Sequence, residues 1–367
     1  MSTAFQTLKG QPPIVIAHRG ASGERPEHTL EAYQRAIASG ADFIEPDLVV
    51  TKDGVLVARH ENALATINSQ TKQVVEATTD VAVRPEFAER LTTKIVDGRA
   101  VTGWFAEDFT LAELKTLNAR ERLPQLRGTE FDGQGLKIPT LPEIIQLIKQ
   151  TESETGVKVG IYPETKHPTY FAQEGTFLDG TPIRCSLGQQ LIDTLLAENF
   201  RAPCRVFIQS FEVSNLQELA QTIMPAAGVC FPLVQLIAEA GSPYDFVVNG
   251  DGRSYAELCT LSGLAYIATY ASAIGPSKRL VIPEQHHQLL APTTLIEDAH
   301  AAGLLVHVYT LRHESIFLAA DYHGSPEAEY EQLIHLGVDG YFTDFPAMGQ
   351  QMRSQFSADA LQQHELR

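Results

Sequence analysis

The sequence predicts a single-domain (β/α)₈ barrel over residues 1–367, with a small cap inserted at 62–137. Eight apolar runs of strand length alternate with amphipathic helical patterns, an order typical of a parallel sheet covered by helices. The runs are nearly continuous in apolar residues, as strands buried on both faces are. A doubly wound sheet is the alternative. We prefer the barrel because the strand count is eight and no G-x-G-x-x-G motif opens a helix.

The predicted barrel strands follow one another along nearly the whole chain. They cover 14–17, 43–49, 158–163, 205–210, 229–234, 265–269, 304–310 and 339–343. An extra strand is predicted over 55–60, directly after the turn Lys52-Asp53-Gly54. Because that turn is too short for a parallel crossover, the extra strand must run antiparallel to the strand before it.

The helices between the strands have readable ends. Thr29 is a predicted N-cap, and Gly40 stands where a left-handed residue closes the helix. Three Thr-x-x-Glu patterns predict capping boxes, because the threonine and the glutamate each bind a free backbone N–H of the other. The patterns are Thr110 to Glu113, Thr140 to Glu143 and Thr294 to Glu297, and further helices are predicted over 188–198, 214–221 and 326–336.

Two long segments interrupt this alternation. Residues 62–137 follow the extra strand, and residues 167–186 follow the third barrel strand. Loops of this length are usually functional or disordered. Loops after strands lie over the carboxyl end of a barrel, where substrates bind. We therefore interpret 62–137 as a cap on the barrel and not as an independent domain.

The charge balance excludes several classes of partner. The formal net charge is −17, from 28 basic and 45 acidic residues. Nonspecific binding to nucleic acid or to an anionic membrane is disfavoured, because those surfaces need many Lys and Arg residues. The acidic surface also repels phosphate at long range, so any phosphate site needs a local cation.

Targeting and redox signals are sparse. No apolar run approaches the roughly 18 residues that span a bilayer, and the polar segment 1–13 has no secretory h-region. The four widely spaced cysteines form no C-x-x-C motif, so we expect buried free thiols and no zinc site or disulfide framework.

Acidic residues stand where two neighbouring strands end. Glu45 and Asp47 are two residues apart, so their side chains share one face of the second strand, as do Glu164 and Lys166 after the third. Three converging carboxylates form a hard oxygen site that suits Ca²⁺ or Mg²⁺ better than Zn²⁺. A salt-bridged pair at a strand end is the alternative for Glu45 and Asp47, and it is disfavoured because paired acids in an apolar strand are costly without a cation.

Two histidines at strand ends are the acid–base candidates. His18 ends the first strand and His60 ends the extra strand, and imidazoles titrate near neutral pH. Arg19 and Lys166 are candidates for binding phosphate oxygens, Arg19 as a planar fork and Lys166 as a point charge. No H-x-H, H-E-x-x-H or G-x-S-x-G motif supports a zinc hydrolase or a serine esterase.

These motifs together resemble the glycerophosphodiester phosphodiesterase family. The matching segments are the sequences at 17–21, 26–29, 45–47, 51–54, 60, 164–166, 209–211, 308–310 and 340–346. They occur in family order over nearly the whole chain, and the long insert after His60 is similar to the bacterial periplasmic branch. The chain departs at Pro46, where the family often has Leu or Val, and at Tyr309, where many members have Trp.

The resemblance implies a barrel that hydrolyses glycerophosphodiesters, such as glycerophosphocholine and glycerophosphoethanolamine, to sn-glycerol 3-phosphate and an alcohol. It assigns the family's roles as follows: metal binding to Glu45, Asp47 and Glu164, catalysis to His18 and His60, and phosphate or substrate binding to Arg19, Lys166, Phe211 and Tyr309. The implied cofactor is one Ca²⁺ or Mg²⁺ ion, and the implied partner is the small-molecule substrate.

Several alternatives stay open at this stage. The nucleophile is either the glycerol 2-hydroxyl or a water, and either histidine could be the base. The head group, the oligomeric state (a homodimer included) and the compartment are not decided, since the branch is periplasmic but the chain has no secretory signal. Rival functions are a phospholipase D-like lyase, disfavoured by the polar insert, and a non-catalytic barrel, disfavoured because His18 and His60 are both present.

Overall fold

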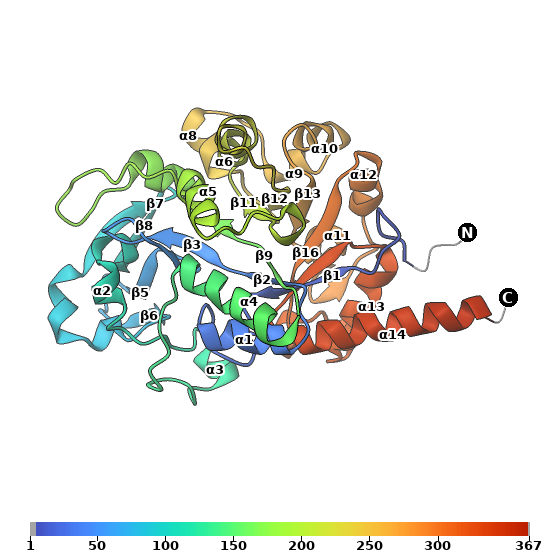
Figure 1. The fold of residues 1–367 in the computed structure, drawn as a ribbon, viewed down its shortest axis with the longest axis horizontal. Helices are drawn as coiled ribbons and strands as arrows, with labels where there is room; N and C mark the ends of the chain where they lie inside the picture. Colours follow the sequence, from blue (N-terminus) through green and yellow to red (C-terminus); the bar gives the residue numbers. More distant parts are fainter. Residues whose placement is uncertain (1–4, 366–367) are drawn as a thin grey trace.

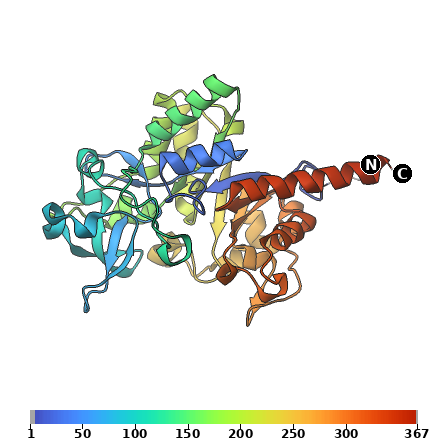
Figure 2. The ribbon, with the colours of Figure 1, turned by 90° about the horizontal axis from the view of Figure 1, so that it is seen from below.

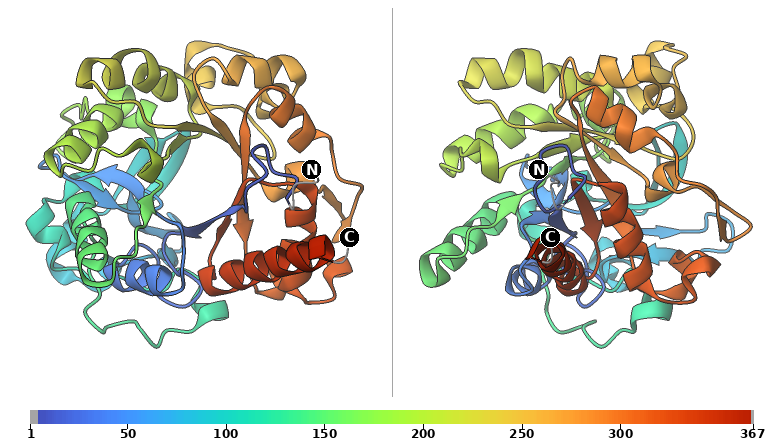
Figure 3. Two further views of the ribbon diagram at one scale, coloured as in Figure 1. Left: turned by 45° about the vertical axis from the view of Figure 1, so that its right-hand side comes forward. Right: turned by 90° about the vertical axis from the view of Figure 1, so that its right-hand side faces the viewer.

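The computed structural model describes residues 5–365 and contains a ring of parallel strands with helices outside it (Figures 1 and 3). The strands of the ring are β1 (Ile14–His18), β2 (Phe43–Glu45) with β3 (Asp47–Val50), β9 (Gly160–Ile161) with β10 (Glu164–Thr165), β11 (Ile208–Ser210), β12 (Leu233–Ile237), β13 (Ala273–Pro276), β16 (Leu305–Leu311) and β17 (Gly340–Thr343). Residues 1–4 and 366–367 lie outside the described residues, so the prediction made for segment 1–13 falls partly outside them.

Pairing closes the ring. β1 pairs in parallel with β17 on one side and with β2 on the other. β2 pairs with β9 and its continuation β3 pairs with β10, after which each strand pairs with the next one in sequence. Pro46 and Pro163 divide the second and third strands, because proline has no N–H to donate. The predicted (β/α)₈ barrel is confirmed.

Helices cover the outside of the barrel. They are α1 (Leu30–Ala38), α4 (Leu141–Thr155), α5 (Leu187–Ala197), α6 (Val213–Glu218), α7 (Met224–Ala227), α8 (Tyr244–Asn249), α9 (Tyr255–Leu258), α10 (Leu261–Ile267), α11 (Lys278–Val281), α12 (Leu295–Ala301), α13 (Pro326–Leu336) and α14 (Pro346–Glu365). A π-helical turn, η6 (Leu219–Ile223), joins α6 to α7, and another, η4 (Tyr170–Glu174), follows β10. The segment 283–290 forms the hairpin of β14 (Glu284–Gln285) and β15 (Gln288–Leu289).

Two of the three predicted capping boxes are present. The hydroxyls of Thr140 and Thr110 each accept a hydrogen bond from the backbone N–H three residues on. The glutamate at that position accepts one from the backbone N–H of the threonine. The predicted box at Thr294 is wrong. Its backbone is not extended, and its hydroxyl donates to Asp298 at 2.7 Å.

One predicted barrel strand is also wrong. Residues 265–269, read as the sixth strand, lie in α10 and the turn after it, and the sixth strand is β13. Leu264 and Ile267 are buried at helical spacing and Thr260 caps the helix, so the short apolar run belongs to a helix. The fifth strand, expected at 229–234, begins only at Leu233. Gly228 ends α7 in a left-handed conformation, and residues 229–232 then lead irregularly into the strand.

The segment 62–137 contains a sheet that the sequence did not reveal (Figure 2). Four antiparallel strands are ordered β6 (Val74–Ala77), β5 (Ala63–Ile67), β8 (Arg99–Phe105) and β7 (Thr92–Val96), and they are followed by α2 (Leu111–Leu114) and α3 (Pro124–Arg127). Short 3₁₀ turns are η1 (Val81–Val83), η2 (Pro85–Arg90) and η3 (Ala106–Asp108) here, and η5 (Pro203–Arg205), η7 (Ser315–Phe317) and η8 (Ala320–Tyr322) in the barrel. The extra strand is present as β4 (Leu56–Ala58), antiparallel to β3.

A buried apolar cluster fills the barrel interior. It consists of Ile16, Phe43, Tyr162, Val234, Ala273 and Phe342. The rings of Tyr162 and Phe342 meet edge to face at 5.1 Å, and the Tyr162 hydroxyl lies 2.7 Å from His307 Nδ1. This packing holds the strands in place below the polar side chains at their carboxyl ends.

Two further findings concern the surface. Cys204 and Cys230 are exposed and Cys185 and Cys259 are half-buried, so the prediction of buried thiols is wrong for the first two. Cys204 lies in η5 before β11, and Cys230 lies in the irregular segment before β12, so both stand outside the packed strands. Among the described helices, none has the length and apolar character that crossing a bilayer requires.

Candidate active site at the carboxyl ends of the strands

All nine residues predicted for the site line one cavity of about 140 Å³. They are His18, Arg19, Glu45, Asp47, His60, Glu164, Lys166, Phe211 and Tyr309, and the same cavity is lined by Gln209, Leu236, Thr310, Arg312 and Phe342. Strand register explains the gathering, since His18 pairs with Glu45 across β1 and β2, and Glu164 pairs with Asp47 across β10 and β3. The side chains therefore meet where the strands end.

The three carboxylates form a compact cluster. Glu45, Asp47 and Glu164 each offer an oxygen, all within 4.8 Å of one another, and all three residues are buried. Burial raises the pKa of Glu164 to about 8 and, with the charge of Asp47, raises the pKa of Glu45 well above its usual range. Buried acids this close repel one another unless a cation stands between them. The donor set fits a divalent cation that prefers oxygen ligands.

Basic groups border the acidic cluster. Lys166 Nζ lies 2.9 Å from Glu164 Oε1, and Arg19 Nε lies 3.4 Å from Asp47 Oδ2. Although burial opposes it, Lys166, His28 and Arg19 hold the pKa of Asp47 well below its usual range. Positive charge is therefore available beside the carboxylates, where a phosphate would need it.

His28 has a closer relation to the site than the sequence suggested. His28 is fully buried and its Nε2 lies 2.9 Å from Asp47 Oδ2. Its Nδ1 lies 2.7 Å from the Tyr33 hydroxyl. His28 thus orients the Asp47 carboxylate, a role that its place in the 26–29 motif could have suggested.

The two candidate acid–base histidines face the cavity in a neutral state. Burial and the neighbouring Arg19 lower the pKa of His18 to about 4, against the opposing charge of Asp344. Burial, Arg19 and Lys166 lower the pKa of His60 well below its usual range. At neutral pH both imidazoles therefore have a lone pair able to accept a proton.

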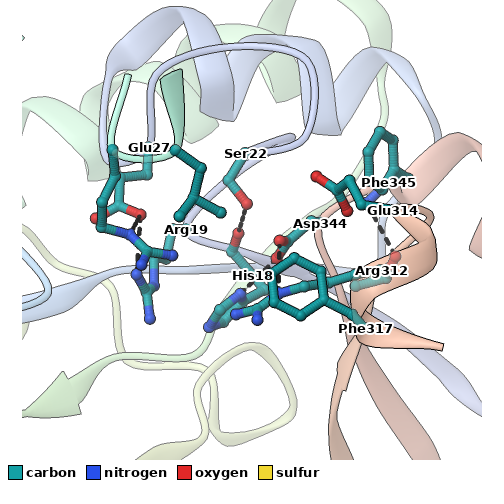
Figure 4. Close-up of polar contacts among 12 residues, drawn as sticks. His18, Arg19, Ser22, Glu27, Arg312, Glu314, Phe317, Asp344 and Phe345 are labelled. Atoms are coloured by element: carbon teal, nitrogen blue, oxygen red, sulfur yellow. Dashed lines mark hydrogen bonds and ion pairs between the residues drawn. The ribbon is translucent and has the colours of Figure 1, made fainter. Parts of the chain in front are cut away.

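Asp344 orients His18, and sequence reasoning gave it no role. His18 Nδ1 donates to Asp344 Oδ1 at 2.6 Å, and Figure 4 shows the two side chains pointing toward one another. Because Nδ1 is occupied, Nε2 is the atom left to exchange protons with a substrate. The placement of Asp344 after the last strand was visible in the sequence, but not its partner 326 residues away. Gln209, which donates to Glu45 at 3.1 Å, was also missed.

A further histidine, His167, is linked to His60 through Glu61. His167 Nε2 is 2.9 Å from Glu61 Oε2, and Glu61 Oε1 is 3.2 Å from His60 Nδ1. His167 Nδ1 is 2.6 Å from Asp97 in the turn between β7 and β8. Burial lowers the pKa of His167, but the bonds to Asp97 and Glu61 outweigh it and raise that pKa to about 10. His167 is therefore a cation at neutral pH.

The raised pKa of His167 predicts a pH dependence of stability. Since the pKa is about 10 in the folded chain and 6.5 is the ordinary value, the stabilisation is complete below pH 6.5 and is lost as pH rises toward 10. The loss is at most about 5 kcal/mol. We expect urea unfolding to show a fall in the free energy of unfolding from pH 6.5 to 10 that is smaller in His167→Gln. Equal falls in the two proteins would contradict this.

Comparison with known proteins identifies the family. The model of the glycerophosphoryl diester phosphodiesterase family matches residues 18–348. Glycerophosphodiester phosphodiesterase GDPD6 of Arabidopsis thaliana is 35% identical over 92% of this chain and 85% of its own length. A glycerophosphodiester phosphodiesterase of Haemophilus influenzae is 29% identical over 95% of this chain and 92% of its own length.

Solved structures share the fold. A structure from Silicibacter pomeroyi superposes with a TM-score of 0.60 at 21% identity, covering 96% of this chain and 98% of its own. An Oleispira antarctica phosphodiesterase, solved with its product sn-glycerol-3-phosphate, has a TM-score of 0.54 at 19% identity and covers 95% and 99%. These likenesses support the barrel. With the family match over most of its length, the chain belongs to the glycerophosphoryl diester phosphodiesterase family and is a phosphoric diester hydrolase.

Proposed function

We propose that the chain hydrolyses glycerophosphodiesters such as glycerophosphocholine and glycerophosphoethanolamine to sn-glycerol 3-phosphate and the free alcohol. One observation carries the proposal: two histidines, three carboxylates and three basic side chains line a single cavity. This set can bind a phosphate, hold a divalent cation and move protons to and from oxygen atoms. The Oleispira structure, which contains the same product, supports the substrate class.

In the proposed reaction, Arg19 and Lys166 bind the phosphodiester oxygens. One histidine removes a proton from the nucleophile, either the glycerol 2-hydroxyl or a water, as its oxygen forms a bond to phosphorus. The bond from phosphorus to the alcohol oxygen breaks. The other histidine, protonated once the bound phosphodiester offsets the charges of Arg19 and Lys166, donates its proton to that oxygen. If the 2-hydroxyl attacks, the cyclic phosphate is then opened by water. Phe211 and Tyr309, whose rings meet edge to face at 6.0 Å, border the substrate pocket.

Glu45, Asp47 and Glu164 would hold one Ca²⁺ or Mg²⁺ ion. Such an ion neutralises phosphate charge and lowers the pKa of a bound hydroxyl. The family in general depends on a divalent metal, and the buried acidic cluster supports the same dependence for this chain.

The segment 62–137 is proposed to be a cap of a single-domain enzyme in the long-insert branch of the family. Its antiparallel sheet follows β4 and His60 in the sequence. The Haemophilus relative matches over 95% of this chain, a span that includes the insert. The Arabidopsis relative also matches over 92%, so we extend the proposed branch to plant proteins.

A coupled assay for glycerol 3-phosphate tests the function. We expect product from glycerophosphocholine and glycerophosphoethanolamine, none from sphingomyelin, and loss of activity with a chelator that Ca²⁺ or Mg²⁺ restores. Release of choline from sphingomyelin, with formation of a cyclic ceramide phosphate, would favour the lyase alternative. Absence of turnover on every substrate with both metals would favour a non-catalytic barrel.

A further inference from the structure

We propose that the insert 62–137 positions the active-site side chains, in addition to covering them. Three charged residues of the insert bind groups that hold residues of the proposed site. They are Arg127 for His18, Arg122 for Arg19 and Asp97 for His60. The inference rests on the proposed function, because it assumes that His18, Arg19 and His60 act on the substrate.

The first bridge runs from Arg127 through Asp344 to His18. Arg127, in α3, donates from Nη2 to Asp344 Oδ2 at 2.5 Å, while Asp344 Oδ1 holds His18 Nδ1 at 2.6 Å. Arg127 also donates to Glu314 at 2.6 Å and to the Ser22 carbonyl at 2.8 Å. The side chain of Arg127 is only 5% exposed, so its charge belongs to the interior of the site. The insert thereby fixes one oxygen of the carboxylate that orients His18.

The second bridge runs from Arg122 through Glu27 to Arg19. Glu27 Oε2 accepts from Arg122 Nε and from Arg19 Nη1, each at 2.8 Å. Glu27 is 3% exposed, and Figure 4 shows it next to Arg19. A buried carboxylate shared by two guanidinium groups holds both in place. Arg122 therefore helps to fix the direction in which Arg19 presents its remaining N–H groups.

The third bridge runs from Asp97 through His167 and Glu61 to His60. Asp97 lies in the β7–β8 turn with a left-handed backbone, φ 46°, and binds His167 at 2.6 Å. His167 in turn binds Glu61 at 2.9 Å, and Glu61 lies 3.2 Å from His60. The turn of the insert sheet is thus linked to the second candidate catalytic histidine.

Removing Arg127 has a specific electrostatic consequence. The charged groups that face His18 are Asp344, Arg312 and Arg19. Arg127 and Arg312 share Asp344 Oδ2, with Arg312 Nε at 3.0 Å. Without Arg127, the carboxylate is less neutralised and stabilises the protonated form of His18 more strongly. The acidic limb of the pH profile of kcat/KM should therefore move to higher pH, which a loss of packing alone would not cause.

The test compares Arg127→Met with Arg127→Lys and with a matched control, Arg84→Met. Arg84 is also an insert arginine, but its ion pairs, to Asp80 at 3.4 Å and Glu86 at 2.8 Å, stay within the insert. On glycerophosphocholine we expect Arg127→Met to lower kcat about 10- to 100-fold, the usual effect of removing a group that orients a working residue. Arg127→Lys should recover part of the loss, and Arg84→Met should keep kcat and KM of the wild type.

Two further variants keep the test decisive if Arg127→Met does not fold. Arg122→Met should raise KM about tenfold because Arg19 binds phosphate, and Asp97→Asn should lower kcat. Wild-type kcat, KM and pH profile in all the folded insert variants, with His18→Asn inactive in the same assay, would overturn the positioning role alone. An active His18→Asn would instead remove His18 from the proposed mechanism, and an inactive wild type would overturn the proposed function.

Discussion

Replacing His18 with asparagine is expected to lower kcat by about 10²–10⁴-fold, the range typical of removing a general acid or base. Asparagine can still donate to Asp344, which His18 Nδ1 contacts at 2.6 Å, but it cannot exchange a proton with the substrate. The loss should therefore appear in kcat with little change in the fold. Steady-state rates from the coupled glycerol 3-phosphate assay, together with thermal unfolding, measure both.

His60→Asn should give a similar loss for the same reason. Because the two imidazoles act in one reaction, the double variant should be only slightly worse than either single one. His286 is exposed on the β14–β15 hairpin, and His286→Asn serves as the control that keeps wild-type activity. Near-normal turnover in His18→Asn or in His60→Asn would remove that residue from the mechanism.

The barrel was predictable because its signal is local. Apolar runs such as 14–17 and 340–343 are long enough to bury, and caps such as Thr140 mark where helices start. Prediction failed at 265–269, where a five-residue apolar run fits a helix as well as a strand. It also failed in the insert sheet, because three of the four residues of β6 are exposed and they show no alternation of apolar and polar residues.

In the site, too, only the residues that follow local rules could be predicted from the sequence. Glu45, Asp47 and Glu164 could be placed from strand period and strand ends, which are local rules. The partners that orient the site could not, because they come from distant segments. Arg127 reaches Asp344 across 217 residues and Arg122 reaches Glu27 across 95, and no periodicity in the sequence relates such pairs.

Removal of the acidic cluster should abolish the response of the protein to divalent metal. We expect Ca²⁺ or Mg²⁺ to raise the free energy of unfolding of the wild type, by about 2.7 kcal/mol at a free ion concentration 100 times the Kd. Glu164→Gln should lose most of this gain, because the glutamine amide keeps the shape of the side chain but lacks the charge. Urea unfolding with and without metal measures this without any assay of activity.

Glu212 provides a matched control for that experiment. It is a buried carboxylate, 4% exposed, whose pKa burial also raises to about 8, but it binds Thr169 and lies outside the acidic cluster. Glu212→Gln should therefore keep the stabilisation by metal. If Glu164→Gln keeps it too, Glu164 is not a ligand.

The charge of the cluster explains why the effect should be large. In the described site, three buried carboxylates are accompanied by Arg19 and Lys166, and Lys166 Nζ lies only 2.9 Å from Glu164. A phosphodiester that recruits those two cations leaves the carboxylates facing one another, which is costly at this depth. Substrate binding and metal binding should therefore support one another. We expect chelation to raise KM as well as to lower kcat in the wild type, and an unchanged KM for glycerophosphocholine after chelation would contradict this coupling.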